Sequence, residues 1–345
     1  MCKIMDVTLR DGSYAVNFQF TQRDTFYLVK QLEKAGMEYI EIGHGMGIGA
    51  SSAKNGIAVA SDMEYLAAAK RASSNCKIGM FCIPGIADVK DLTLLAKNGL
   101  DFVRVGTNVG EVEQSAAYID CAKNLGLTVM SNYMKSYTVE PHKFSEKVKL
   151  SVGYGTDVIY IVDSAGGMFP AHIKGYYDAI KDIETGFHGH NNLGLAVANA
   201  LYAKQLGVSY IDCSLQGLGR SAGNTATEQF VACLNKDTST SRMDLKLLCE
   251  NGSHYIHKYI LKRGINATDL YCGLYDFHSS YLKHIYIYSA KYDVDPLDLI
   301  EAYSDYDKVN MNEAVLQDIA MSLPKSSGQF TYFDVEDSFG NEQGN

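Results

Sequence analysis

The chain has 345 residues, of which 46% are hydrophobic, and it carries a formal net charge of −9. This composition provides enough apolar material for a large buried core and argues against a nucleic-acid partner, which would require a basic surface. No apolar run approaches the ~20 residues of a membrane span, and the first residues lack the apolar stretch of a secretory signal, so we expect a cytoplasmic protein without a membrane partner.

The first two-thirds of the chain alternate between short strand-like runs and helical patterns. Strands are predicted at residues 3–9, 39–43, 77–83, 102–107, 127–133, 158–163, 185–190 and 210–215. Amphipathic helices are predicted between them, for example at residues 21–36, 89–99, 115–126 and 195–207. Each of these four segments ends in a glycine, which can stop a helix through a left-handed residue before the next strand.

Eight strand–helix units in about 235 residues favour an α/β fold of the (β/α)₈ type, the TIM barrel. The nearly continuous apolar strands are typical of a parallel sheet that is covered by helices. A doubly wound open sheet is the main alternative, although no G-x-G-x-x-G motif follows the first strand to support a dinucleotide site.

The pattern changes near residue 240. Helices are predicted at residues 243–260, 281–292, 295–304 and 311–323, with few strand candidates among them. The sequence therefore predicts three parts: a TIM-barrel catalytic domain at 1–240, a small helical C-terminal domain at 241–323, and a polar tail at 324–345. The tail is rich in polar residues, glycine and serine, and we expect it to be partly disordered.

Polar candidates for a site stand at the carboxyl ends of predicted strands, where TIM barrels carry their active residues. His188 and His190 end the seventh strand, and residues i and i+2 of a strand face the same side, so both imidazoles can reach one cation. Arg10 and Asp11 follow the first strand. Because the first and seventh strands flank the eighth, Asp11 can complete an open site that suits Mn²⁺, Mg²⁺ or Co²⁺. A surface ion pair and two structural histidines are the alternative interpretation.

Two further loops carry candidates. The segment "GLGRSAGN" (217–224) follows the eighth strand, and Asn224 can place its amide near the metal or cap the next helix. The sixth strand ends in Asp163 and Ser164. Ser164 can bind a substrate carboxylate, or both residues can cap the helix that follows.

Three motifs, "DVTLRDG", "HGHNNLGLAVANA" and "GLGRSAGN", together resemble a metal-dependent lyase and synthase superfamily built on a TIM barrel, which includes 3-hydroxy-3-methylglutaryl-CoA lyase and isopropylmalate synthase. Within it, "IEIGHGMG", "MFCIPGIADVKDL", "VRVGTN", "IYIVDSAGGM" and "SSYLKHIYIYSAKYDVDPLDLI" are similar to segments of the 4-hydroxy-2-oxovalerate aldolase family. The glycine-rich loop lacks the acidic residue usual in the synthases and the cysteine of the CoA lyase. Both departures argue against a CoA ester as substrate.

This resemblance implies a class II aldolase that cleaves a 4-hydroxy-2-oxoacid to pyruvate and an aldehyde. Asp11, His188 and His190 would hold the divalent metal, most simply Mn²⁺, with Asn224 beside them. Arg10 would stabilise the metal-bound pyruvate enolate, a role whose loss typically costs ~10²–10³ in rate. Ser164 would help to hold the substrate carboxylate.

Two positions depart from the aldolase pattern. The family has a catalytic histidine after the "RDG" turn, where this chain has Tyr14, and a tyrosine in the C-terminal domain, where this chain has His278. If both side chains point into one pocket, the exchange preserves an acid–base pair. His278 is then the expected base, since free histidine has a pKa of ~6.5, and Tyr14 assists it. An altered or lost activity is the alternative.

Two other functions stay open at this point. One is a Claisen-type acyl-CoA lyase or synthase of the same superfamily, and the other is a non-catalytic relative that kept the metal site. The resemblance implies a small 2-oxoacid as substrate. It also allows a homo-oligomer, or a partner acylating aldehyde dehydrogenase that would receive the volatile aldehyde.

Overall fold

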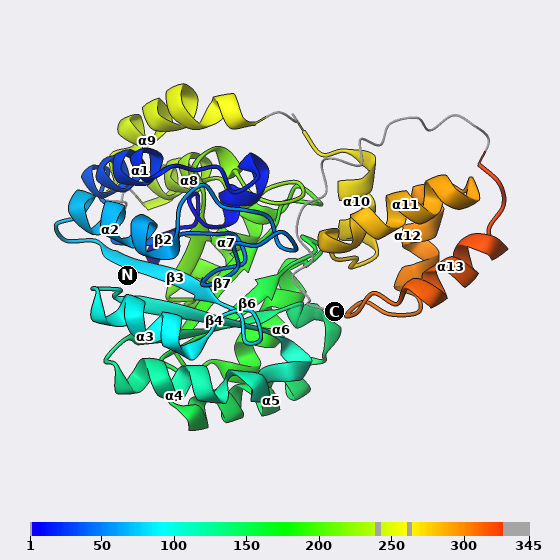
Figure 1. The fold of residues 1–345 in the computed structure, drawn as a ribbon, viewed down its shortest axis with the longest axis horizontal. Helices are drawn as coiled ribbons and strands as arrows, with labels where there is room; N and C mark the ends of the chain where they lie inside the picture. The colour runs from blue at the N-terminus through cyan, green and yellow to red at the C-terminus, as the bar shows by residue number, and fades with distance from the viewer. Residues whose placement is uncertain (1, 239–242, 261–263, 327–345) are drawn as a thin grey trace.

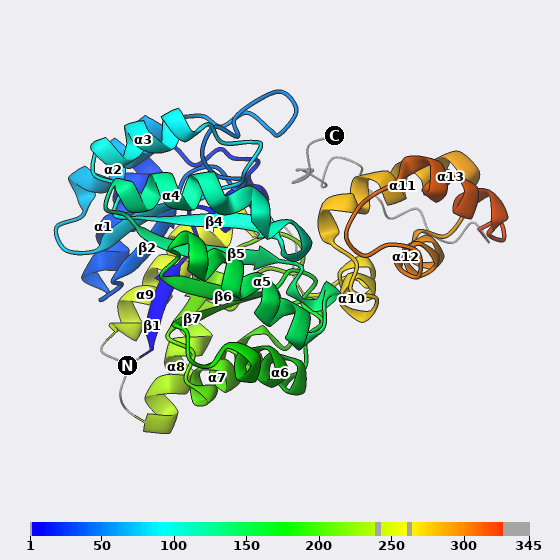
Figure 2. The same cartoon turned by 90° about the horizontal axis from the view of Figure 1, so that it is seen from below.

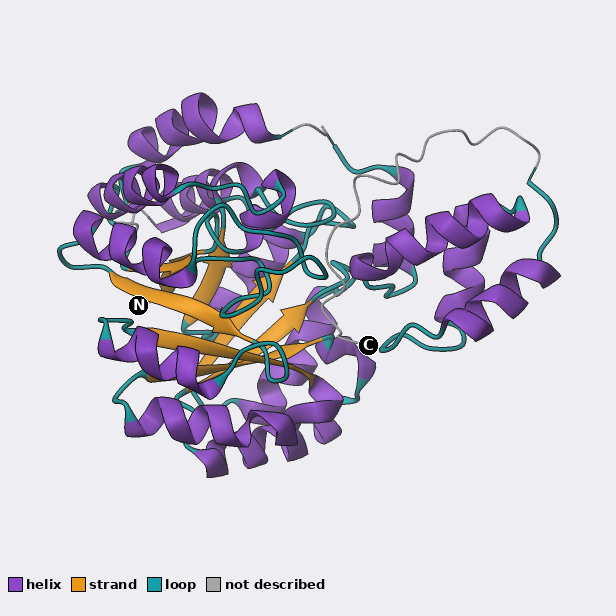
Figure 3. Ribbon diagram, in the orientation of Figure 1, coloured by secondary structure: helices purple, strands orange, loops and turns teal. Residues whose placement is uncertain are grey.

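The computed structural model describes residues 2–238, 243–260 and 264–326. Within these ranges, eight strands close into a barrel in sequence order, and every pairing, including that of the first strand with the eighth, is parallel (Figures 1 and 3). The strands are Lys3–Asp6 (β1), Tyr39–Ile42 (β2), Lys77–Cys82 (β3), Phe102–Asn108 (β4), Thr128–Met134 (β5), Val158–Asp163 (β6), Thr185–Gly189 (β7) and Tyr210–Cys213 (β8). The predicted TIM barrel is confirmed, and the open doubly wound sheet is excluded.

Helices surround this barrel (Figure 3). They are Gln22–Lys34 (α1), Asp62–Ala72 (α2), Val89–Lys97 (α3), Ala116–Asn124 (α4), Pro141–Tyr154 (α5), Pro170–Ile180 (α6), Ala196–Leu206 (α7) and Thr227–Thr238 (α8). The glycines predicted to stop four of them all have left-handed φ angles, namely Gly36, Gly99, Gly126 and Gly207. No helix in the described ranges combines the length and apolar character that crossing a bilayer would require.

The barrel interior changes character along its axis. Its amino-terminal part is filled by apolar and aromatic side chains such as Met5, Phe102, Met130 and Tyr210. Toward the carboxyl ends of the strands, charged and polar side chains from β2, β4, β5, β7 and β8 point inward and contact one another. The fold therefore places a polar layer directly under the barrel mouth, where TIM-barrel enzymes have their active sites.

The chain leaves the barrel through α9 (Leu245–Asn251), and Leu248 and Ile256 still pack into the barrel's core. A separate core, which includes Phe277 and Ile285, joins α10 (Ala267–Leu274), α11 (Leu282–Tyr292), α12 (Pro296–Ser304) and α13 (Glu313–Ser322) beside the barrel (Figures 1 and 2). The helical C-terminal region is thus as expected, with α10 not among the predicted helices. The domain boundary at residue 240 stays a prediction, and the predicted tail lies, from residue 327, outside the described residues.

The loop after β2 packs against the end of β3 through a glycine. Gly47 has a φ of 90°, and a Cβ there would lie 2.1 Å from the backbone oxygen of Phe81. The ring of Phe81 lies 4.7 Å from the guanidinium carbon of Arg10. The close approach at Gly47 therefore supports a residue that contacts the candidate site.

We expect Gly47→Ala to lower the free energy of unfolding by about 3 kcal/mol or more, because it combines a left-handed φ with a backbone clash. Urea unfolding monitored by circular dichroism would measure the change. The matched control is Gly153→Ala, at an exposed position of α5 with no atom within 4 Å of the added Cβ. Gly153→Ala should raise the free energy of unfolding by about 0.5 kcal/mol. Equal effects of the two substitutions would contradict the proposed clash at Gly47.

Candidate metal centre and active site

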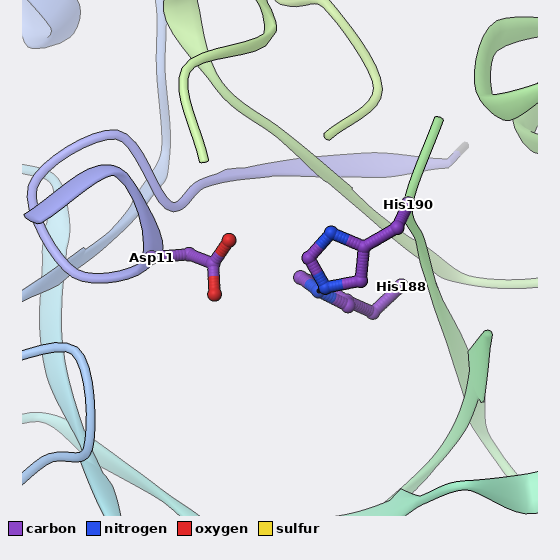
Figure 4. A group of neighbouring side chains, drawn as sticks. All are labelled: Asp11, His188 and His190. Carbon is purple, nitrogen blue, oxygen red and sulfur yellow. Dashed lines mark hydrogen bonds between the residues drawn. The ribbon is translucent and has the colours of Figure 1, made fainter. Parts of the chain in front are cut away.

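Asp11, His188 and His190 converge at the barrel mouth (Figure 4). Asp11 begins the 3₁₀ helix that follows β1, His188 lies in β7, and His190 comes just after that strand. One carboxylate oxygen and one ring nitrogen from each histidine lie within 4.8 Å of one another, and all three side chains are buried. The structure thus brings together the three residues that the sequence singled out.

Hydrogen bonds behind the two histidine rings fix their tautomers. His188 Nδ1 lies 2.8 Å from Asp212 Oδ2, and His190 Nδ1 lies 3.3 Å from the carbonyl oxygen of Gly223. Because a carboxylate and a carbonyl only accept, each ring carries its hydrogen on Nδ1 and keeps a lone pair on Nε2. The two Nε2 atoms face each other at 3.4 Å, an arrangement that a cation bound by both would stabilise.

The protonation states also suit a cation. Burial lowers the pKa of His190 to about 3, so its ring is neutral at physiological pH. Burial acts on Asp11 in the opposite sense, but the Arg10 guanidinium, 2.8 Å away, together with His190, His188 and Arg220, outweighs burial and holds the pKa of this carboxyl well below its usual range. The site therefore presents a carboxylate and neutral imidazole, the forms that ligate divalent ions.

Asn224 lies beside Asp11. Its Nδ2 donates to Asp11 Oδ2 at 2.7 Å and to the carbonyl of Leu218 at 3.1 Å. Its Oδ1 is buried and has no hydrogen-bond partner among the described residues. Gly219 permits this packing, since a Cβ there would lie 2.4 Å from Asn224 Nδ2. A carboxylate, two imidazoles and an orphaned amide oxygen form a mixed nitrogen and oxygen donor set that fits a divalent cation.

A buried guanidinium lies beneath these groups. Arg104 projects inward from β4 with no exposed surface, and its Nη1 donates to Glu41 Oε2 at 2.9 Å, its Nη2 to Asp212 Oδ2 at 2.5 Å and its Nε to Asn132 Oδ1 at 3.2 Å. The guanidinium carbon also lies 4.3 Å from the ring centroid of Tyr160. All three acceptors of Arg104 are therefore fixed in position.

Two of these acceptors also accept hydrogen bonds from residues of the candidate site. Asp212 accepts from His188, and Glu41 Oε2 also accepts from Arg10 Nε at 2.7 Å. The connected cluster holds three carboxylates and two guanidiniums, which leaves one excess negative charge, on Asp11, Glu41, Asp212, Arg10 and Arg104. A divalent cation would reverse that sign, and an anionic substrate would then be attracted.

The end of β6 serves two purposes. The Asp163 carboxylate accepts from the backbone N–H groups of Gly167 and Met168, each at 3.0 Å, and so holds the loop before α6. Ser164 lines the cavity beside the metal ligands, and its Oγ accepts from the N–H of Lys135 at 3.0 Å. That contact leaves the hydroxyl hydrogen of Ser164 to be donated to another group.

The exchanged residues Tyr14 and His278 meet at a third residue, Arg220. The Arg220 guanidinium carbon lies 5.3 Å from the centroid of the Tyr14 ring, and its Nη2 lies 3.1 Å from His278 Nε2. Arg220 is also the member of this group that lines the cavity. Burial lowers the pKa of His278 well below the ~6.5 assumed from the sequence, and the nearby Arg220 adds to this effect.

Several site residues escaped the sequence analysis. Arg220 lies in the glycine-rich loop, for which the prediction rested on the glycines and Asn224. Glu41, Arg104, Asn132 and Asp212 share one signal: each is a polar or charged residue inside an otherwise apolar strand. In a barrel strand covered by helices, such a residue points into the interior, and several of them together indicate a charged cluster there.

The fold and these side chains define a class: a TIM-barrel enzyme whose active site lies at the carboxyl ends of its strands. A family model described as HMGL-like matches residues 1–254. The chain belongs to this HMGL-like family.

Curated relatives extend the match over nearly the whole chain. The 4-hydroxy-2-oxovalerate aldolase of Carboxydothermus hydrogenoformans is 36% identical over 95% of this chain and 98% of its own length. The 4-hydroxy-2-oxovalerate aldolase of Moorella thermoacetica is 35% identical over 94% of this chain and 97% of its own length. The resemblance stated from the motifs is confirmed, and so is the expected class of enzyme, a carbon–carbon lyase.

Solved structures support the fold. The N-terminal domain of a putative aldolase from Bacteroides vulgatus superposes with a TM-score of 0.71 at 22% identity, over 88% of this chain and 97% of that one. The carboxyl transferase domain of Rhizobium etli pyruvate carboxylase superposes with a TM-score of 0.76 at 16% identity, over 93% and 60%. At such identities these structures show the fold alone.

We expect Asp212→Asn to weaken Mn²⁺ binding about 10- to 100-fold, because His188 loses the carboxylate that fixes its tautomer. Titration with Mn²⁺ alone, following free Mn²⁺ by electron paramagnetic resonance, would measure this. Asp178→Asn is the control, at an exposed residue of α6 that pairs with Lys174. Unchanged Mn²⁺ affinity in folded Asp212→Asn would contradict the assignment.

Proposed function

We propose that the protein is a divalent-cation-dependent class II aldolase that cleaves a 4-hydroxy-2-oxoacid to pyruvate and an aldehyde. The observation that carries this proposal is the convergence of Asp11, His188 and His190 next to Arg10. It occurs in a chain whose curated relatives, matched over nearly their full length, are named 4-hydroxy-2-oxovalerate aldolase. The substrate is accordingly a small 2-oxoacid.

In this proposal, Asp11, His188, His190 and Asn224 hold the cation. Mn²⁺ is the ion of choice for a mixed nitrogen and oxygen donor set, and Mg²⁺ and Co²⁺ are alternatives. When bound, the cation would act as a Lewis acid toward the 2-oxo group. Ser164 donates its hydroxyl hydrogen to the substrate carboxylate.

Arg10 stabilises the negative charge that develops on the enolate oxygen of pyruvate as the carbon–carbon bond breaks. Its guanidinium is held by Glu41 through Nε and by Asp11 through Nη1, and it lies against the Phe81 ring. These contacts fix the guanidinium in position before the reaction, and Arg10 also lines the cavity. A donor that is oriented in advance is the arrangement that gives large electrostatic stabilisation of a transition state.

The proton of the substrate's 4-hydroxyl group passes to His278, with Tyr14 assisting. Burial lowers the pKa of His278 and keeps its ring neutral, and with the Nδ1 hydrogen directed at Ser280 Oγ, 2.7 Å away, the lone pair is on Nε2. That nitrogen lies 3.1 Å from Arg220 Nη2, and the arginine has to give way to the substrate hydroxyl. The cytoplasmic location, a homo-oligomer and a partner aldehyde dehydrogenase stay predictions from the sequence.

We expect pyruvate release from at least one member of a panel of 4-hydroxy-2-oxoacids, loss of activity on chelation and recovery with Mn²⁺. Asp11→Ala should reduce the rate by at least about 10³-fold, because it removes a ligand and the counter-charge of Arg10. A coupled assay for pyruvate measures this, with Asp178→Ala as control. Metal binding without turnover would instead indicate a non-catalytic relative, and CoA-dependent turnover a Claisen-type enzyme.

We expect His278→Gln to lower kcat about 10²-fold or more with a smaller change in KM, since glutamine can hold Arg220 but cannot take a proton. Tyr14→Phe keeps the ring against Arg220 and should cost less. Steady-state kinetics on the best substrate would measure both. His284→Gln, at a half-buried histidine of α11, is the control. Near-normal turnover of His278→Gln would rule out its role as the base.

A further inference from the structure

Asn132 lies in the interior of the barrel, next to the groups assigned above. It projects inward from β5 and is 2% exposed. It lines the same small cavity as Arg10, Ser164 and His188. None of the roles proposed so far uses its amide, although the side chain reaches the space that a substrate would enter.

The orientation of this amide follows from its neighbour. An arginine side chain only donates hydrogen bonds, so the atom of Asn132 that faces Arg104 Nε, at 3.2 Å, is Oδ1. The Nδ2 group, with its two hydrogens, is therefore on the other side. It has no hydrogen-bond partner among the described residues, and an acceptor that enters the cavity would provide one.

Holding Arg104 does not by itself explain Asn132. Arg104 already has two carboxylate partners, Glu41 and Asp212, at 2.9 and 2.5 Å, and it stacks on Tyr160. The neutral contact to Asn132 is the longest of its three hydrogen bonds. Arg104 is therefore held by its two carboxylates, and its guanidinium orients the amide of Asn132.

The groups around Asn132 indicate which kind of acceptor would bind to its Nδ2. β5 and β6 are hydrogen-bonded neighbours, with Asn132 opposite Tyr160 in the register, and Ser164 directly follows β6. The amide of Asn132, inside β5, and the hydroxyl of Ser164, just beyond the end of β6, are thus donors from neighbouring strands, and both line the same cavity. Two neutral donors next to the cation of Arg10 suit a planar anion with two oxygens, which is a carboxylate.

We infer that Asn132 is a substrate-binding residue that donates from Nδ2 to the carboxylate of the 2-oxoacid, beside Ser164. This inference rests on the proposed function and deepens it, because it assigns the pyruvate half of every substrate to β5 and β6. The same pair of donors would then hold pyruvate after cleavage. Asn132 would accordingly affect the binding of all substrates of the enzyme equally, whatever their aldehyde half.

Binding of pyruvate to the Mn²⁺-loaded, full-length protein tests this by calorimetry. Asn132→Asp keeps an oxygen that accepts from Arg104 but replaces the donor with a second acceptor, and Asn132→Ala removes the amide. Both should raise the dissociation constant for pyruvate about 10- to 100-fold, as expected for a lost hydrogen bond to a charged group. Mn²⁺ should bind Asn132→Asp at least as tightly as it binds the wild type.

Ser131→Ala is the matched control, since Ser131 is the preceding residue of β5 and its Oγ donates outward to Thr156 Oγ1. It should bind pyruvate like the wild type. The inference is overturned if Asn132→Asp binds pyruvate normally, if it loses Mn²⁺ and pyruvate to the same extent, or if the loaded wild type binds no pyruvate. If these binding differences are found but the wild type cleaves no 4-hydroxy-2-oxoacid, only the proposed function is contradicted.

Discussion

The guanidinium of Arg104 connects the stability of the barrel interior to the geometry of the site. A charge with no exposed surface is costly to bury unless it is paired and fully hydrogen-bonded. Glu41, Asp212 and Asn132 meet that requirement from three different strands. The Glu41 oxygen that accepts from Arg104 also accepts from Arg10, and the Asp212 oxygen that accepts from Arg104 also lies next to His188 Nδ1. The contacts that stabilise the buried charge of Arg104 therefore also orient an arginine, a histidine and an amide of the candidate site.

Most of the fold was predictable because its signals are local. Apolar strands of five to seven residues and amphipathic helices that end in glycine recur along the chain, and these patterns depend on neighbours in sequence. The attachment of the segment after residue 243 was not predictable in this way. Its apolar face looks the same whether it packs on the barrel, as Leu248 and Ile256 do, or on the C-terminal helices. Only the tertiary arrangement decides.

The residues of the candidate site also fall into two groups, those with a local signal in the sequence and those whose partners depend on the tertiary structure. Asp11, His188 and His190 could be found because each lies at or just beyond a predicted strand end, and such ends meet at one face of a barrel. The partners of Arg104 lie 63 and 108 residues away in sequence, at Glu41 and Asp212. Contacts of that separation follow from the closure and register of the barrel, so a single charged residue in an apolar strand shows its burial but not its partner.

The expected exchange of residue types at Tyr14 and His278 can be explained physically by the contact of both residues with Arg220. A tyrosine ring attracts a cation to its face, and a neutral histidine offers a lone pair to an N–H donor, so the two residues suit a guanidinium on two different sides. His278 belongs to the C-terminal region, whereas Arg220 follows β8 of the barrel. The contact therefore ties the C-terminal helices to the barrel mouth, and the proposed acid–base pair requires both parts of the chain. The barrel interior alone fixes the groups around Arg104, while the residues around Arg220 depend on the association of the two parts.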